Sequence, residues 1–227
     1  MSRIGDGYGS EFHLRRILAE DPGTLSSAVL EACGLPNASL EWLPFPRDSQ
    51  SPSGDRELRG MEFVTERRDV LEAWKTWWPQ SGRPPCWDAI GRLAYEDVTD
   101  WVLLEAKANH VEFCSPPTGA GDSSRRTIED ALKETKRYLG VHRAFRWTDT
   151  YYQYANRLAS LYFLQVKMKE PARLVFLYFG GDAFPDQRPC PEGRREWEPL
   201  LSACHQTLGL PEEHALSARV HDVFLEV

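Results

Sequence analysis

Apolar positions along the chain change between helical and strand spacing in an order that is typical of an α/β protein. Apolar residues three and four positions apart predict helices, and short continuous or alternating apolar runs bounded by Gly and Pro predict strands. Helices are predicted for residues 11–18, 22–33, 65–78, 127–139, 149–167 and 194–208. Strands are predicted for residues 39–45, 86–95, 101–108, 174–179 and 220–227. We therefore expect one domain, residues 1–227, in which helices flank a central sheet.

Local signals place the ends of several elements. Asp21 and Pro22 predict the cap and the first residue of the second helix, and Gly34 predicts its end. Residues 96–100 have the length and polarity of a hairpin connection, which would fold the two strands around it side by side. Residues 47–60 and 115–122 are rich in Ser, Pro and Gly and predict exposed loops, of which the first is expected to be mobile.

Composition narrows the class of protein. The chain has 227 residues, of which 41% are hydrophobic and 27% charged, and this is enough to bury a sizeable core in one domain. No run of about 18 apolar residues predicts a membrane span, and the N-terminus lacks the apolar segment of a signal peptide. Five cysteines without a C-x-x-C pair predict reduced, mostly buried thiols. We expect a cytoplasmic protein that does not enter a membrane, and a homodimer is compatible with the sequence.

Two charged residues interrupt the otherwise apolar strand at residues 101–108. Glu105 and Lys107 lie two positions apart, so strand geometry places both side chains on one face. Burying a carboxylate and an ammonium group is costly unless they are paired or bind a metal, which suggests a functional use. Alternatively, the strand lies at a sheet edge and both side chains point to solvent. The pair alone does not decide between these interpretations.

Asp88 stands near the start of the preceding strand, where the predicted hairpin would bring it close to Glu105. Two carboxylates a few ångströms apart repel each other at neutral pH, and a divalent cation with oxygen ligands commonly relieves that repulsion. A lysine beside them can balance charge and orient a water molecule. The sequence therefore predicts a divalent-cation site at Asp88 and Glu105.

An aspartate, a gap and apolar residues that run into Glu-x-Lys resemble the motif of the PD-(D/E)XK, or restriction-endonuclease-like, phosphodiesterase superfamily. Asp88, Glu105 and Lys107 match this motif, although Trp87 stands where the family commonly has proline. The resemblance implies an αβββαβ core, with a mixed central sheet flanked by helices, to which this chain adds a C-terminal helix and strand. It also implies Mg²⁺, for which Mn²⁺ is expected to substitute, held by Asp88 and Glu105, with Lys107 beside the attacking water.

The same resemblance implies further site residues. The backbone carbonyl of Ala106 stands at a position that the family commonly uses as a metal ligand. Glu11, at the start of the first helix, matches an acid that often completes the metal shell, but the helix dipole alone also favours a glutamate there. Gln153 partly matches a Gln-x-x-x-Tyr helix that some exonuclease-like members place beside the metal, with Arg157 four residues later in this chain. The polar side of this helix either faces the site or is solvated.

Basic residues are concentrated between residues 123 and 173. This segment holds eleven Lys and Arg against five acidic residues, a balance of +6, which leaves −13 for the rest of a chain with a net charge of −7. Such a segment can face a polyanion, and a solvated helical face has the same composition. Lys133, Lys136, Gln153 and Arg157 are the candidate nucleic-acid contacts.

These observations predict a magnesium-dependent nuclease that acts on DNA. One alternative is a ribonuclease that uses the same site. The other is a binding or structural protein that retains the fold without turnover. The eight tryptophans could stack on bases, but their clustering with other apolar residues favours core packing.

Overall fold

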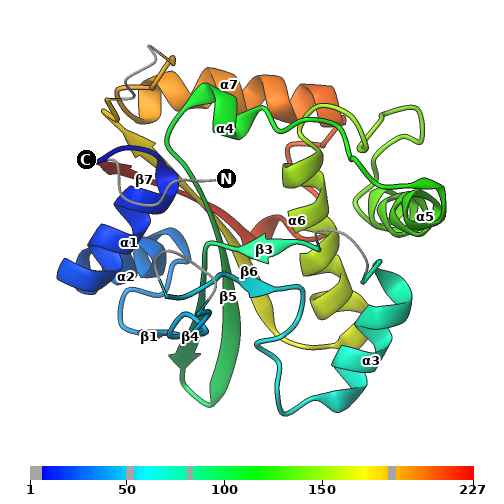
Figure 1. Ribbon diagram of the computed structural model, residues 1–227, viewed down its shortest axis with the longest axis horizontal. Helices are drawn as coiled ribbons and strands as arrows, with labels where there is room; N and C mark the ends of the chain where they lie inside the picture. Colours follow the sequence, from blue (N-terminus) through cyan, green and yellow to red (C-terminus); the bar gives the residue numbers. More distant parts are fainter. Residues whose placement is uncertain (1–6, 50–53, 81–83, 184–187) are drawn as a thin grey trace.

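A five-stranded sheet forms the centre of the protein, with helices on both of its faces (Figure 1). The computed structural model describes residues 7–49, 54–80, 84–183 and 188–227. The strands lie in the order β1, β4, β5, β6 and β7, and a separate two-stranded sheet pairs β2 with β3. The α/β class that the sequence predicts is therefore confirmed.

The bounds of the elements follow the chain order. The strands of the central sheet are β1 Ser39–Trp42, β4 Ala89–Tyr95, β5 Val98–Lys107, β6 Ala172–Gly180 and β7 Val220–Glu226, and those of the small sheet are β2 Leu58–Arg59 and β3 Cys86–Trp87. The helices are α1 Ser10–Glu20, α2 Pro22–Ala32, α3 Arg68–Trp77, α4 His110–Phe113, α5 Asp122–Tyr138, α6 Tyr152–Tyr162 and α7 Arg194–Leu208. A π-helical segment, Phe163–Met168, continues α6, and a 3-10 turn, Ser217–Arg219, precedes β7.

The central sheet is mixed. The neighbours β1, β4 and β5 are antiparallel, whereas β6 is parallel to both β5 and β7. Every residue of β6 is buried, which explains its continuous apolar run, because helices cover both faces of the parallel half. This arrangement confirms the expected mixed central sheet flanked by helices.

Residues of β5 alternate between two cores on opposite faces of the sheet. Val102, Leu104 and Ala106 belong to the core that α1 and α2 cover, whereas Leu103 belongs to the larger core with α3, α5, α6 and α7. Because side chains alternate along a strand, Glu105 and Lys107 point to the face that α6 covers. This face contains the candidate site.

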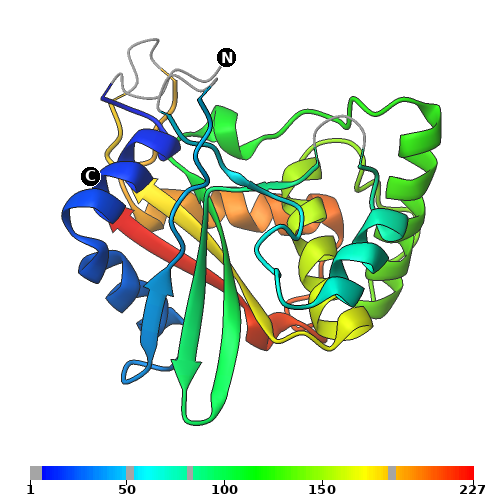
Figure 2. The same ribbon diagram turned by 60° about the horizontal axis from the view of Figure 1, so that its bottom comes forward.

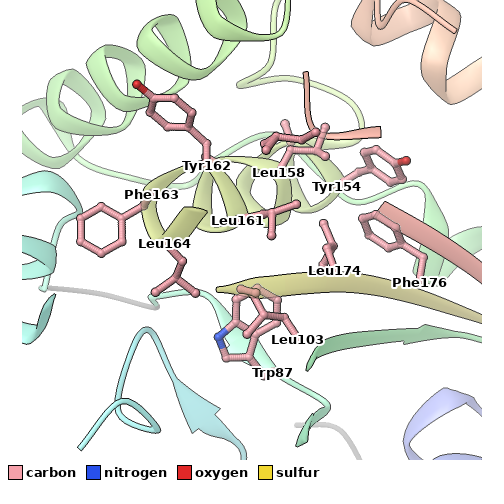
Figure 3. Close-up of a cluster of buried hydrophobic side chains, with 14 of the residues drawn as sticks. Trp87, Leu103, Tyr154, Leu158, Leu161, Tyr162, Phe163, Leu164, Leu174 and Phe176 are labelled. Atoms are coloured by element: carbon pink, nitrogen blue, oxygen red, sulfur yellow. The ribbon is translucent and has the colours of Figure 1, made fainter. Parts of the chain in front are cut away.

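The larger core holds α6 against the sheet (Figure 3). Leu161 of the helix points toward Leu174 of the sheet, and both side chains are buried, as are Leu158 of the helix and Leu103 of the sheet. Each such buried side chain contributes about 1.5 to 3 kcal/mol relative to an exposed one. The apolar contacts therefore fix the helix, and with it the polar residues that α6 presents to β5.

Several predicted bounds are confirmed. The Asp21 side chain accepts a hydrogen bond from the amide of Thr24 (3.2 Å), and Pro22 is the first residue of α2. Helix α7 has the predicted bounds, and β6 and β7 agree with prediction within two residues. These elements share strong local signals, namely a side-chain cap, a glycine after the helix or a long apolar run.

The hairpin connection is shorter than predicted. Tyr95 pairs with Val98, so the turn consists of Glu96 and Asp97, with Glu96 in the left-handed region at φ 50°. Asp100 belongs to β5 and is fully buried, because Arg173 and Arg219 pair with its carboxylate at 2.7 and 2.6 Å. Its charge reflects a buried ion pair rather than a solvated turn.

Other boundaries also differ from prediction. Helix α5 begins at Asp122, before the predicted residue 127, because its first turns carry exposed polar side chains that give no apolar signal. Helix α3 begins at Arg68 instead of residue 65. Helix α6 begins at Tyr152, since Tyr151 adopts the left-handed conformation at φ 65°. Strand β1 ends at Trp42, and Gly9 rather than Ser10 precedes α1.

The described residues of the stretch 47–60 form backbone pairs that an exposed loop would lack. Residues 50–53 lie outside the described residues. Arg47 forms a bridge with Asp55, and β2, Leu58–Arg59, pairs with β3. The prediction of an exposed loop is therefore wrong for the second half of this stretch, because its backbone pairs with the chain that leads into Asp88.

The remaining expectations concern membranes, cysteines and tryptophans. No helix in the described ranges is long and apolar enough to cross a membrane. All five cysteines are free, which confirms the predicted thiols, but the expectation that most are buried is wrong, because only Cys204 is buried and the other four are half-buried. Trp74 and Trp78 stack within the larger core at 3% and 2% exposure, so core packing is confirmed for them.

Candidate active site

Asp88 lies at a break between two strands. Strand β3 before it pairs with β2 in the small sheet, and β4 after it pairs with β5 in the central sheet. The Asp88 amide donates to the carbonyl of Leu104 (3.2 Å), and its carboxylate Oδ2 accepts from the amide of Ala106 (2.7 Å). These backbone contacts hold the carboxylate against β5 beside Glu105, as the sequence predicts.

Glu105 and Lys107 form a buried ion pair on the face of β5 that α6 covers. Lys107 Nζ lies 2.5 Å from Glu105 Oε1, and the two residues are 8% and 1% exposed. Strand β5 lies between β4 and β6 in the sheet. The alternative of a solvated pair on an edge strand is therefore wrong.

The polar side of α6 faces this pair rather than solvent. The Gln153 side-chain oxygen accepts a hydrogen bond from Lys107 Nζ at 2.8 Å. Arg157 donates through Nε to Glu105 Oε2 at 2.7 Å, and its Nη2 lies 2.6 Å from the same oxygen. The backbone amide of Gln153 donates a hydrogen bond to Ser115 Oγ (2.8 Å), which places this residue. Glu105 and Lys107 thus each have a partner on α6.

Arg157 is fixed on every side. Its side chain is 3% exposed, Nη1 donates to Asn156 Oδ1 at 2.8 Å, and Nη2 donates to the carbonyl of Cys86 at 2.5 Å. The guanidinium carbon lies 4.8 Å from the ring centroid of Trp87, a cation–π contact. Arg157 was a candidate nucleic-acid contact, but the structure buries it beside Glu105 and does not expose it to a nucleic acid.

The two carboxylates differ in their electrostatic surroundings. Burial raises the pKa of Asp88 well above its ordinary value, and the negative charge of Glu105 raises it further. Burial would also raise the pKa of Glu105, but Arg157 and Lys107 outweigh it and lower that pKa. Glu105 is therefore ionised and neutralised by two cations, whereas the Asp88 carboxylate faces that of Glu105 and accepts a hydrogen bond from the Ala106 amide.

Sequence analysis missed Glu57. It lies just before β2 and is half-buried, and burial raises its pKa, followed by the charges of Glu105 and Glu11. Its charge in turn raises the pKa of Asp88. No local pattern could have identified Glu57, because only the pairing of β2 with β3 brings it to Asp88.

The structure does not support Glu11 as a third carboxylate beside Asp88 and Glu105. Within the described ranges, no three Asp, Glu, His or Cys side chains are grouped so as to hold a metal ion. Glu11 instead pairs with Arg15 of its own helix at 3.2 Å, and α1 packs on the sheet face opposite to α6. The charge of Glu11 raises the pKa of Glu57, which lies beside the site.

The basic segment is divided among several environments. Lys133 is exposed on α5, whereas Lys136 donates to the carbonyl of Phe145 at 2.8 Å and stabilises the chain after the helix. Lys167 pairs with Glu134 at 2.9 Å, and Arg173 pairs with Asp100. Lys136, Lys167, Arg173 and Arg157 thus all contact groups of the protein itself. The +6 balance therefore overstates the charge that this segment offers to a polyanion.

Comparisons with protein-family models, with curated proteins and with solved structures found no match. The function must therefore be inferred from the geometry of Asp88, Glu105, Lys107, Gln153 and Arg157.

The oxygen donors of the site fit a hard divalent cation. Such ions take carboxylate and carbonyl oxygens, and Mg²⁺ commonly uses only one or two carboxylates and completes its shell with water. Glu105 Oε1 accepts one hydrogen bond, from Lys107 Nζ, and therefore retains a lone pair for coordination. Pairing of β4 with β5 ends at Leu104, so the carbonyl of Ala106, which points to the same side as its amide, lies beyond that ladder.

Proposed function

We propose that this protein is a divalent-cation-dependent phosphodiesterase that cleaves DNA, with Asp88, Glu105 and Lys107 as its catalytic residues. The observation that carries the proposal is the repulsion between Asp88 and Glu105, in which the Asp88 carboxylate is hydrogen-bonded by the Ala106 amide rather than by a cation within the described residues. An ionisable pair whose pKa values are separated by burial and by specific charges is typical of a functional site.

The order of elements supports the same proposal. Helix α1, the antiparallel strands β1, β4 and β5, the helices α5 and α6, and the parallel strand β6 follow the αβββαβ order that the motif implies. The matching residues lie where β4 begins and where β5 ends, on one face of the sheet. Helix α7 and strand β7 extend the sheet beyond this order, as the C-terminal additions expected from the sequence.

Each residue has a role in hydrolysis that follows from its contacts. Asp88, Glu105 and the carbonyl of Ala106 would hold the cation, which supplies positive charge to activate water and to offset charge on the phosphate. Lys107 has three N–H donors, of which Glu105 and Gln153 use two. The third can orient the attacking water or a phosphate oxygen. Arg157 and Gln153 position Glu105 and Lys107.

The reaction is a simple exchange of bonds at phosphorus. The water oxygen forms a bond to phosphorus while one phosphorus–oxygen ester bond breaks. The water gives up one proton to solvent, and the leaving oxygen takes one up. Asp88, Gln153 and Glu57 are the partly exposed residues of the site, so a phosphodiester would approach from their side.

Cleavage of defined nucleic acids tests the proposal. Linear duplex, single-stranded and supercoiled DNA, together with single-stranded RNA, are incubated with the protein in Mg²⁺, Mn²⁺ or EDTA. We expect cleavage of DNA that needs the divalent cation, and a loss of at least about 100-fold in rate for Asp88→Asn and for Lys107→Met, because each acts directly on the reacting groups.

Matched controls separate chemistry from folding. Asp97→Asn and Lys75→Met change the same residue types at exposed positions in the hairpin turn and in α3, and both should retain full activity with unchanged melting temperatures. Cleavage of RNA alone would favour the ribonuclease. Equal activity in Asp88→Asn, Lys107→Met and the parent protein would overturn the proposal.

One observation favours a second candidate, a binding or structural protein without turnover. Lys107 and Arg157 already neutralise Glu105 through short contacts, as in a buried ion network that only stabilises a fold. This alternative predicts that Mg²⁺ and Mn²⁺ leave the melting temperature unchanged, whereas the phosphodiesterase predicts a rise that depends on cation concentration.

A further inference from the structure

We propose that the site holds one divalent cation, and that the Arg157 guanidinium occupies the position beside Glu105 that a second cation would need. The inference rests on the proposed function and specifies its metal content. It follows from the contacts of Glu105, from the fixed placement of Arg157 and from the charges of the four central side chains.

The two oxygens of Glu105 differ in their contacts: Oε1 has one, with Lys107 Nζ, whereas Oε2 has two, with Arg157. Two-metal sites place their ions about 3.5 to 4 Å apart and commonly share a carboxylate between them. Here Arg157 Nε and Nη2 lie 2.7 and 2.6 Å from Glu105 Oε2, so the guanidinium already fills the space that the outer ion of such a pair would take. The Asp88 carboxylate instead accepts a hydrogen bond from the amide of Ala106 at 2.7 Å.

Arg157 cannot easily give up that position. Its remaining donors contact Asn156 Oδ1 and the Cys86 carbonyl, and its plane lies against the buried ring of Trp87. Moving the guanidinium would leave these acceptors unsatisfied and a charge buried without its partner, which is strongly destabilising. The arginine is therefore a permanent cation of the site.

The charge balance agrees with one exchangeable cation. With Asp88 ionised, as cation binding requires, Asp88 and Glu105 carry two negative charges and Lys107 and Arg157 carry two positive charges, so the four side chains are balanced. One divalent cation then matches a phosphodiester together with an attacking hydroxide. A second would add two uncompensated positive charges, and Glu57 could offset only one of them.

Binding of Mn²⁺ to the full chain tests the inference. Free Mn²⁺ is followed by its electron paramagnetic resonance signal during titration, and Asp88→Asn is titrated in parallel to subtract weak surface binding. The expected result is one Mn²⁺ per chain that is lost in Asp88→Asn. Two ions lost in that variant would overturn the inference and leave the proposed function intact. No ion lost would contradict the proposed function itself.

Two arginine variants provide a second readout. Arg157→Gln removes the fixed positive charge, so Mn²⁺ should bind about fivefold more tightly or better, whereas Arg157→Lys should remain close to the parent affinity. A purely structural role for Arg157 predicts weaker Mn²⁺ binding in both variants. Unchanged or weaker binding in a folded Arg157→Gln protein would contradict the role of its charge. If Arg157→Gln does not fold, the stoichiometry of the parent protein still decides.

Discussion

At the scale of single residues, the site joins a strand to a helix through four charged or polar side chains. Lys107 bridges Glu105 and Gln153, and Arg157 holds the other oxygen of Glu105. Asp88 is placed by backbone groups of β5: its carboxylate accepts a hydrogen bond from the Ala106 amide, and its own amide donates to the Leu104 carbonyl. Arg157 is buried, whereas Asp88, which we propose as a cation ligand, is half-buried.

Gln153 tests the positioning of Lys107. Gln153→Ala removes the acceptor that holds Nζ, so the rate should fall about tenfold while the affinity for Mn²⁺ stays within a factor of two, since no cation ligand is lost. Single-turnover cleavage and Mn²⁺ titration measure both quantities. Gln206→Ala, at an exposed position of α7, is the matched control. An unchanged rate in Gln153→Ala would exclude a role for this contact.

At the scale of elements, the sequence predicted which segments form helices and strands better than it predicted their partners. The apolar periodicity of β5 placed Glu105 and Lys107 on one face, and the hairpin placed Asp88 beside them. The same periodicity left open whether the polar side of α6 is solvated, because a stripe that faces a buried ion pair has the same pattern as one that faces water. Glu57 and the burial of Asp100 depend on pairing between distant segments, which no local pattern contains.

The buried ion pair at the start of β5 predicts a large effect on stability. Asp100→Asn removes the partner of Arg173 and Arg219 in a fully buried position, so we expect a loss of about 3 kcal/mol in the free energy of unfolding. Urea denaturation measures it. The neighbouring Asp97→Asn, in the exposed turn, should change the free energy by less than about 0.5 kcal/mol. A loss for Asp100→Asn as small as that of the control would show that this pair does not fasten β5 to β6.

At the scale of the whole molecule, two hydrophobic cores lie on opposite faces of one sheet, between the sheet and the helices that cover each face (Figure 2). The smaller core fixes α1 and α2, and the larger core fixes α6 and α7 and surrounds the polar site. The hairpin of β4 and β5 contributes side chains to both cores, so packing on one face of the sheet helps to place the residues on the other face. A mixed sheet of this kind allows the carboxylates to be supported by two independent apolar layers.

His221 on β7 contributes to the pH dependence of global stability. Burial, followed by the charge of Arg173, lowers its pKa from 6.5 to about 4. The folded state thus keeps the ring neutral, while the unfolded chain takes up a proton below pH 6.5. Stability should be fully present above that pH and should fall by about 1 to 3 kcal/mol as the pH decreases toward 4.

The variant His221→Gln isolates this contribution. Its free energy of unfolding should change less than that of the parent protein between pH 7 and pH 4, and the difference between the two should follow one ionisation. Denaturation curves at each pH provide the measurement. Identical pH dependence in both proteins would show that His221 is not the responsible group.

The most direct measurement of the central claim is a crystal structure grown with Mn²⁺ and recorded at a wavelength where manganese scatters anomalously. We predict one anomalous peak at about 2.0 to 2.6 Å from oxygens of Asp88 and Glu105, with the Ala106 carbonyl as a further ligand and Arg157 still on Glu105. No peak between the two carboxylates at saturating Mn²⁺, or a peak elsewhere with Asp88 left without a cation, would contradict the account.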